Sequence, residues 1–129
     1  YWSFINTETG LPEKLTLADT DPYDLGEKME MDYAPRKIAL PKERKPKESF
    51  AVQKHHLDTN HHVNNCQYIR MAADFLPEDF AVHQLRVEYK RQAVLGNVMI
   101  PEVYMEANKA TVVLNAEDQE PYAVVEFTK

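Results

Sequence analysis

The chain has 129 residues, of which 43% are apolar and 28% charged, which suits one globular domain and is short for two. Its net charge of -6 argues against general nucleic-acid binding, and no run of about 18 apolar residues predicts a membrane span. The single cysteine excludes a disulfide framework and fits a reducing compartment, so we expect a cytoplasmic protein.

The first 48 residues give irregular signals. Residues 1–6, YWSFIN, are typical of a short aromatic strand, and the turn-like sequence TETGLP follows them. Prolines and charge runs dominate residues 13–49, which favours a linker with one or two helical turns. Because the chain also begins without a methionine, we interpret residues 1–48 as the end of a preceding domain and an interdomain linker. Residues 49–129 then form the main domain.

Regular patterns begin at Phe50. Residues 50–57 suit a strand, and apolar residues spaced three and four apart predict a helix from Val63 to Leu76. Pro77 follows this stripe directly and is expected to stop the helix.

Four further strands are predicted after the helix, at residues 84–95, 98–107, 110–116 and 122–128. Gly96-Asn97 and Asn108-Lys109 are typical of tight hairpin turns. One helix against an antiparallel sheet is an α+β arrangement, and a sheet that curls around one central helix is a hotdog fold. The pattern therefore predicts a hotdog domain.

The densest polar cluster lies where the strand at residues 50–57 gives way to the helix. Asp58 or Asn60 could be an ordinary helix N-cap, although one cap needs only one such side chain. A helix N-terminus also offers free N–H groups and partial positive charge, which would stabilise an oxyanion formed from a substrate carbonyl. His62 could act as a general base or hold a water, Asn60 could orient that water or the carbonyl, and Asp58 could fix the imidazole or activate water itself. The full cluster is His55, His56, Asp58, Asn60, His61, His62, Asn64 and Asn65.

Metal binding is an alternative, because four histidines and an aspartate lie within eight residues. Adjacent histidines on a strand point to opposite faces, however, and no pair has the His-x-x-x-His spacing of a helical site, so we expect no metal. Cys66 shares the predicted stripe of Val63 and Ile69, and we interpret it as a small buried apolar residue.

These residues carry a family resemblance. The sequence LDTNHHVNNCQYIRMA, residues 57–72, resembles the active-site segment of the acyl-ACP thioesterases, the enzymes that end fatty-acid synthesis. VEYKRQAVLGNVMIP, which begins at Val87, is similar to a strand of that family with a Glu-Tyr pair and two basic residues. YWSFIN followed by TGLP resembles the last strand of the family's first domain. The motif Asp-x-Asn-x-His, with Val-Asn-Asn and a Tyr-Ile pair, falls on Asp58, Asn60, His62, Val63, Asn64, Asn65, Tyr68 and Ile69.

The resemblance implies two hotdog domains in tandem, with the catalytic second domain in this chain. It implies attack of water on the thioester of a long- or medium-chain acyl-acyl carrier protein, held on 4'-phosphopantetheine, with release of free fatty acid. It implies no metal and no other cofactor. The site residues that it implies are Asp58, Asn60 and His62.

One departure from the family lies at Gln92 and Ala93. Plant members have a Glu-Cys pair here, and the glutamate is proposed to take part in catalysis. A glutamine does not accept a proton as a carboxylate does. We therefore expect Asp58 and His62 to activate water with Gln92 positioning it, or the enzyme to be slow.

A basic run precedes the main domain. Carrier proteins are acidic, so Lys42, Arg44, Lys45 and Lys47 are candidates for carrier docking, and a solvated linker is the alternative. A lone hotdog domain would leave a sheet edge and a helix face without a partner, so we also expect this chain to form a two-fold homodimer.

Three other functions stay open at this stage. An acyl-CoA thioesterase would differ only in the carrier of the acyl group. A hotdog domain that serves only binding or assembly is disfavoured by the Asp-Asn-His set, and a dehydratase fits the Val-Asn-Asn continuation poorly. Acyl-chain length does not follow from these residues.

Overall fold

The computed structural model describes residues 4–23, 26–30 and 33–129. The chain divides into two compact units, Tyr1–Tyr33 and Ala34–Lys129, and each is described by itself. In the first unit, β1 (Phe4–Ile5) pairs antiparallel with β2 (Pro12–Glu13), and helix α1 (Leu17–Thr20) is a single turn. A strand therefore lies within predicted residues 1–6, of which residues 1–3 are outside the described part.

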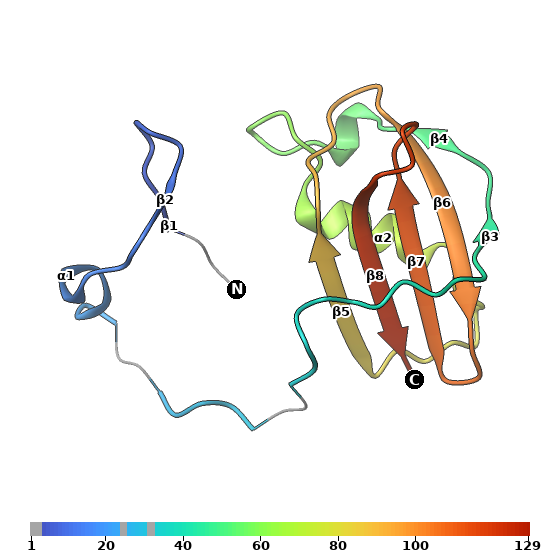
Figure 1. The fold of residues 1–129 in the computed structure, drawn as a ribbon, viewed down its shortest axis with the longest axis horizontal. Helices are drawn as coiled ribbons and strands as arrows, with labels where there is room; N and C mark the ends of the chain where they lie inside the picture. The colour runs from blue at the N-terminus through green and yellow to red at the C-terminus, as the bar shows by residue number, and fades with distance from the viewer. Residues whose placement is uncertain (1–3, 24–25, 31–32) are drawn as a thin grey trace. The chain divides into compact units, whose positions relative to one another are not determined.

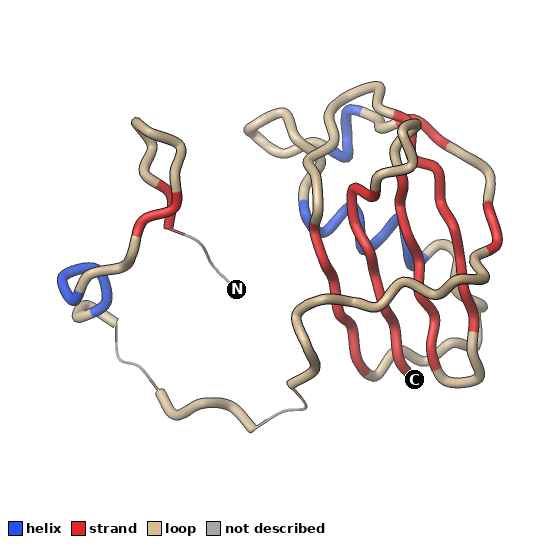
Figure 2. Tube along the Cα trace, viewed as in Figure 1, coloured by secondary structure: helices blue, strands red, loops and turns tan. Residues whose placement is uncertain are grey.

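The second unit is built on a six-stranded antiparallel sheet with the order β3-β6-β7-β8-β5, in which β4 also pairs with β6. Helix α2 (Asn65–Ala73) lies across one face of the sheet (Figure 1), and a long loop crosses the other face (Figure 2). One helix enclosed by an antiparallel sheet is the predicted α+β hotdog arrangement. The strands are β3 (Lys45–Pro46), β4 (Phe50–Ala51), β5 (Gln84–Tyr89), β6 (Val98–Met105), β7 (Lys109–Asn115) and β8 (Pro121–Thr128).

The predicted domain boundary after residue 48 stays a prediction. Residues 34–48 belong to the compact second unit, and β3 within them pairs with β6. The segment from 34 to 44, which we call the strap, is the loop that crosses the outer face of the sheet.

The strand predicted for residues 50–57 is wrong beyond Ala51. A short 3-10 helix, η1 (Lys54–His56), follows β4 instead. The Gln53 backbone N–H donates a hydrogen bond of 2.9 Å to Nδ1 of His56, which curls the chain where an extended strand was expected. A side chain that bonds a nearby backbone group in this way competes with sheet pairing.

The hairpin predicted at Gly96-Asn97 is also wrong. Strand β5 pairs with β8, and β6 pairs with β7. Strands β5 and β6 are therefore not neighbours in the sheet, although they are consecutive in the sequence. The turn itself exists, because Gly96 has φ 81 and Asn97 N donates to the Val94 carbonyl. Its backbone pairs with Val52 and not within a β5–β6 hairpin. The predicted turn at Asn108-Lys109 does join the paired strands β6 and β7.

Helix α2 is shorter than predicted at both ends. It begins at Asn65, where the Asn64 side chain accepts a hydrogen bond of 2.9 Å from Cys66 N, so the N-cap is Asn64 and the alternative of a cap at Asp58 or Asn60 is wrong. The start is delayed because Val63 N bonds the Ala93 carbonyl in extended conformation. The helix ends at Ala73, and turns occupy the remaining residues before Pro77.

Cys66 is exposed, so its predicted burial is wrong. The buried stripe of α2 is Tyr68, Met71 and Ala72. Cys66 lies two positions before Tyr68, which is about 200° around an α-helix and therefore on the far side. The prediction failed because it counted Val63 as helical.

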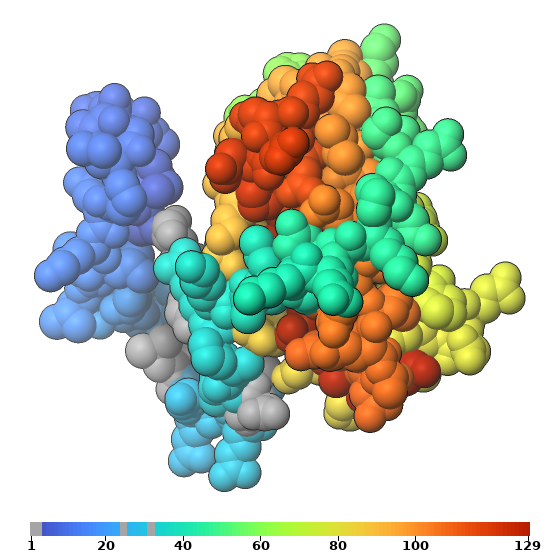
Figure 3. Space-filling model, turned by 45° about the vertical axis from the view of Figure 1, so that its right-hand side comes forward, coloured from blue at the N-terminus to red at the C-terminus, as the bar shows by residue number. Residues whose placement is uncertain are grey.

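Strand β7 is buried along almost its whole length because both faces of the sheet are covered. On the inner face, Val112 and Leu114 pack in the main core with α2. On the outer face, Ile38 of the strap forms a small cluster with Val113 and Val124. Figure 3 shows the strap lying over the sheet strands. Burying one such side chain stabilises the fold by about 1.5–3 kcal/mol.

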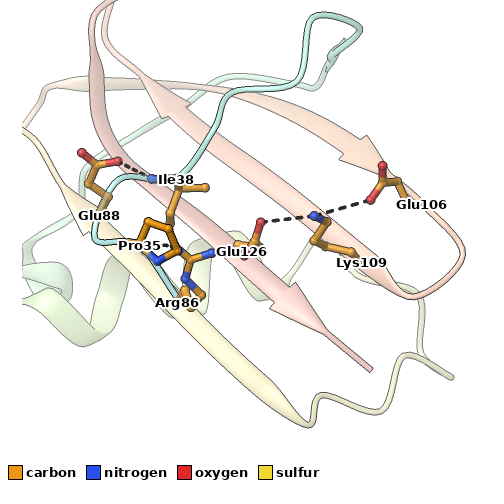
Figure 4. A network of polar contacts seen from close by, with 7 residues as sticks. All are labelled: Pro35, Ile38, Arg86, Glu88, Glu106, Lys109 and Glu126. Carbon is orange, nitrogen blue, oxygen red and sulfur yellow. Dashed lines mark hydrogen bonds and ion pairs between the residues drawn. The ribbon is translucent and has the colours of Figure 1, made fainter. Parts of the chain in front are cut away.

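Polar contacts also hold the strap to the sheet (Figure 4). The Ile38 backbone N–H donates a 3.0 Å hydrogen bond to Glu88, and Arg86 donates to the Pro35 carbonyl. Arg86 also pairs with Glu126 at 2.7 Å. A hydrogen bond from the neighbouring Lys90 lowers the pKa of the Glu88 carboxyl, and the bond from the Ile38 N–H adds to this effect. The carboxyl therefore stays ionised and accepts both bonds. None of the described helices is long and apolar enough to cross a membrane.

Candidate functional site

A pocket of about 460 Å³ lies where the loop before α2 meets the segment that follows β5. All four predicted catalytic residues line it: Asp58, Asn60, His62 and Gln92. Their convergence depends on the fold, because Gln92 is 30 positions from His62 in the sequence. The remaining lining residues are Val63, Asn64, Asn65, Tyr68, Tyr89, Lys90 and Arg91.

The loop from residue 58 to residue 62 is organised by the carboxylate of Asp58. Its Oδ1 accepts hydrogen bonds from the backbone N–H groups of Asn60, at 2.8 Å, and His62, at 3.3 Å. The Asp58 backbone closes the same loop, because its N–H donates to the His62 carbonyl at 2.8 Å. His61 takes a left-handed conformation, φ 62, at the tight turn. Asp58 thus fixes the backbone that carries Asn60 and His62.

The segment that carries Gln92 is tied to the same loop. Ala93 O accepts a 2.8 Å hydrogen bond from Val63 N, and Val94 forms an isolated bridge with His62. Ala93 itself is fully buried in the core. The residue at the position of the plant cysteine therefore contributes packing in this chain, whereas its neighbour Gln92 is exposed in the pocket.

The N-terminus of α2 borders the pocket through Asn64 and Asn65. Tyr89, at the end of β5, donates a hydrogen bond of 3.1 Å from its hydroxyl to the Asn65 carbonyl, which fixes the helix start against the sheet. The partial positive charge of a helix N-terminus favours an anion at this place. The pocket therefore combines an imidazole, four side-chain amides and a carboxylate with a favourable field for an oxyanion.

Two basic residues on the pocket wall are paired with acids. Lys90 bonds Glu88 at 2.7 Å, and Arg91 bonds Asp118 at 2.7 Å while its guanidinium lies 4.8 Å from the centre of the Tyr122 ring. The hydrogen bonds from Arg91 lower the pKa of the Asp118 carboxyl. Both pairs are near solvent, so their contribution to stability is small.

The other histidines of the polar cluster do not line this pocket. His55 and His56 pack edge to face with ring centres 4.1 Å apart. Burial lowers the pKa of His56, and the nearby His55 and Arg70 add smaller effects in the same direction. Within residues 4–23, 26–30 and 33–129, no group of three or more His, Cys, Asp or Glu side chains is arranged to hold a metal ion. The sequence cluster is therefore divided by the fold, and only part of it meets in the pocket.

The four predicted docking residues lie elsewhere on the second unit. Arg44 pairs with Glu102 at 2.7 Å and also bonds the Pro41 carbonyl, whereas Lys42, Lys45 and Lys47 are exposed. They flank β3, at the sheet edge opposite β5. Four strand spacings of about 4.8 Å separate these edges, which is roughly 19 Å.

Sequence reasoning gave no site role to Tyr68 or Tyr89, although both line the pocket. Each had a usable signal. Tyr68 continues the buried stripe of α2 toward its polar start, and Tyr89 ends the inward-facing series Leu85, Val87 on β5. An aromatic hydroxyl at the end of an apolar stripe next to polar residues is a candidate lining residue.

A family model supports the resemblance seen in the sequence. The model described as the acyl-ACP thioesterase C-terminal domain matches residues 39–124. This match includes all four predicted catalytic residues and the four predicted docking residues. A search of the curated proteins found no match to this chain.

Solved structures similar to this chain have the same fold. An acyl-ACP thioesterase from Bacteroides thetaiotaomicron matches with a TM-score of 0.67 and 16% identity, over 96% of this chain and 52% of its own. The 12:0-ACP thioesterase from Umbellularia californica gives 0.65 and 17%, over 96% and 51%. A Staphylococcus aureus protein solved in complex with CoA gives 0.57 and 17%, over 67% and 74%. The chain thus spans about half the length of the two acyl-ACP thioesterases.

Proposed function

Because this chain belongs to the acyl-ACP thioesterase family through its C-terminal domain, we propose that its pocket hydrolyses the thioester of a long- or medium-chain acyl-acyl carrier protein and releases free fatty acid. The observation that carries the proposal is the meeting of Asp58, Asn60, His62 and Gln92 in one pocket beside a helix N-terminus. Family membership supplies the reaction, and the pocket supplies groups suited to it.

In the proposed reaction, His62 takes a proton from water as the water oxygen bonds to the thioester carbon. The carbonyl oxygen becomes an oxyanion, which the N-terminus of α2 and the Asn60 amide stabilise. The carbon–sulfur bond then breaks, the sulfur leaves as the pantetheine thiol after protonation by His62, and the fatty acid is released. No other reactant is needed.

Asp58 and Gln92 have supporting roles in this proposal. The Oδ1 atom of Asp58 holds the loop, so its second oxygen, Oδ2, is the one that could orient the imidazole or the water. Gln92 positions the water through its side-chain amide, where a plant-type enzyme would place a carboxylate. An amide orients a water without taking its proton, so His62 is the base in this arrangement.

For the carrier of the acyl group, one alternative to the acyl carrier protein has specific support. The fold likeness to a protein solved with CoA keeps acyl-CoA as the second candidate, since the two carriers share the pantetheine arm. The test compares kcat/KM of the full-length protein on the same acyl chain attached to carrier protein and to CoA. A value at least tenfold higher on carrier protein supports the proposal, and a higher value on CoA overturns the choice of carrier.

The exposed lysines on the β3 edge are proposed to attract the acidic carrier. A folded protein of about 100 residues has a radius of gyration of about 13 Å, so one carrier could contact this edge while its arm reaches the pocket. Arg44 contributes less than the lysines, because Glu102 already neutralises it.

We also propose a cellular location and an oligomeric state for this chain. A reducing location such as the cytoplasm suits the exposed thiol of Cys66.

The exposed inner-face residues Leu85 and Tyr89 on the edge strand β5 favour self-association of this chain as a dimer. Light scattering on the isolated chain tests it, and a monomer at all concentrations would exclude the dimer.

A further inference from the structure

Tyr68 is the buried titratable group of the pocket for which the proposed reaction has no use. It is only 3% exposed, yet it lines the pocket beside the residues assigned to chemistry. Burial raises the pKa of its hydroxyl, which therefore keeps its proton at neutral pH. A neutral hydroxyl can accept one hydrogen bond while it donates another.

The hydroxyl of Tyr68 is bonded to the segment that carries Gln92. It accepts a buried hydrogen bond of 2.9 Å from the backbone N–H of Ala93, the residue directly after Gln92. The Ala93 carbonyl is bonded at 2.8 Å to Val63 N, directly after His62. Ala93 is therefore held on both sides of its backbone, by the helix through Tyr68 and by Val63, which directly follows the loop of residues 58–62.

These two bonds set the position of Gln92 relative to His62. The isolated bridge between Val94 and His62 belongs to the same antiparallel pairing. Gln92 itself is exposed and lies beyond the end of β5, so sheet pairing does not fix it. The Tyr68 ring is in turn held edge to face against Tyr89, with centres 5.9 Å apart, and Tyr89 bonds the start of α2.

We propose that Tyr68 is a positioning residue for hydrolysis, which acts by holding the Ala93 backbone so that the Gln92 amide meets the water activated by His62. This rests on the proposed function and deepens it. A displacement of about 1 Å in a positioning group lowers the rate of the chemical step much more than it weakens substrate binding. Tyr68 thus acts through Gln92, and its effect must disappear when the Gln92 amide is removed.

The experiment is a double-mutant cycle of Tyr68→Phe and Gln92→Ala in the full-length protein, with an acyl N-acetylcysteamine thioester as the probe. Tyr68→Phe should lower kcat at least fivefold with KM changed less than twofold. In the Gln92→Ala background, the same change should lower kcat less than twofold. Tyr104→Phe is the matched control, because it removes a tyrosine hydroxyl that bonds Glu106 on the outer face, and its kcat should stay unchanged.

Independent, multiplying effects of the two substitutions would overturn the proposal, as would an unchanged kcat in Tyr68→Phe. If Tyr68→Phe does not fold, Ala93→Gly tests the same contact from the other side, because glycine loosens the backbone that the hydroxyl holds. It should lower kcat at constant KM, and an unchanged kcat overturns the proposal. Hydrolysis by the unaltered protein tests the proposed function separately, so the two failures are distinguishable.

Discussion

The loop of residues 58–62 and the strap, residues 34–44, are both polar segments outside the regular elements, yet the fold uses them in opposite ways. In the loop, Oδ1 of Asp58 accepts hydrogen bonds from backbone N–H groups, and the Asn60 and His62 side chains line the pocket. In the strap, the contacts of Ile38 and Arg44 face the sheet. The difference teaches that a polar residue type indicates chemistry only when the fold leaves its reactive atoms facing a pocket.

The largest expected effect lies in the loop. His62→Ala should lower kcat by about 10²–10⁴-fold, because general acid–base catalysis contributes rate factors of this size. Steady-state kinetics on an acyl thioester measures it. His83→Ala is the control, since His83 is exposed and does not line the pocket. Equal rates for the two variants would remove the distinction between a catalytic loop and ordinary polar surface.

The strap should affect stability and not chemistry. Ile38→Ala should lower the free energy of unfolding by about 2–3 kcal/mol, because it empties a small buried cluster. Urea unfolding measures this, and kcat per folded molecule should be unchanged. Leu40→Ala, at an exposed strap position, should cost less than about 0.5 kcal/mol. Similar losses for both variants would show that the strap does not dock through Ile38.

The exposed lysines at the end of the strap and around β3 give a third region for the comparison. Reversing Lys42, Lys45 and Lys47 to glutamate should raise KM for an acyl-carrier protein about tenfold at low salt and leave KM for a small thioester unchanged. Added salt should weaken the difference. Reversal of Lys14, Lys28 and Lys129 controls for total charge. An equal rise of KM for both substrates would exclude docking.

The smallest expected effect is a pH dependence from His56, which borders the loop without entering the pocket. Its pKa is lowered in the folded state, so the unfolded chain binds the proton more readily. The stabilisation is complete above the ordinary histidine pKa of 6.5 and is lost as the pH falls below it. Urea unfolding at pH 7.5 and pH 5.5 should show this decrease, and His56→Gln should reduce it. An unchanged decrease in the variant would assign it to other groups.

The sequence was sufficient for the fold class because its signals are local. The apolar stripe that includes Ile69 and Ala72 predicted the helix, and the runs that became β6, β7 and β8 predicted strands with close boundaries. Strand order is not local, so Gly96-Asn97 was interpreted as a β5–β6 hairpin although β5 pairs with β8. The start of α2 was misplaced because Val63 pairs with a segment 30 residues away.

The candidate site was predictable in part for the same reason. Asp58, Asn60 and His62 lie within five residues and belong to one motif, and Gln92 was found through the family resemblance. No periodicity indicated that Ile38 would be buried. Among the described positions 33–40, Ile38 alone is buried and the others are exposed, so no repeating pattern surrounds it. Tyr68 could be predicted as a helix residue but not as the hydrogen-bond partner of Ala93, because the contact joins residues 25 positions apart.

The most direct test of the central claim is the rate at which the full-length protein releases free fatty acid from acyl-carrier protein, measured beside the double variant Asn60→Ala, His62→Ala. A hydrolytic pocket predicts release by the unaltered protein and at least a 100-fold slower release by a folded double variant. Equal rates for the two proteins would contradict the assignment of hydrolysis to this pocket.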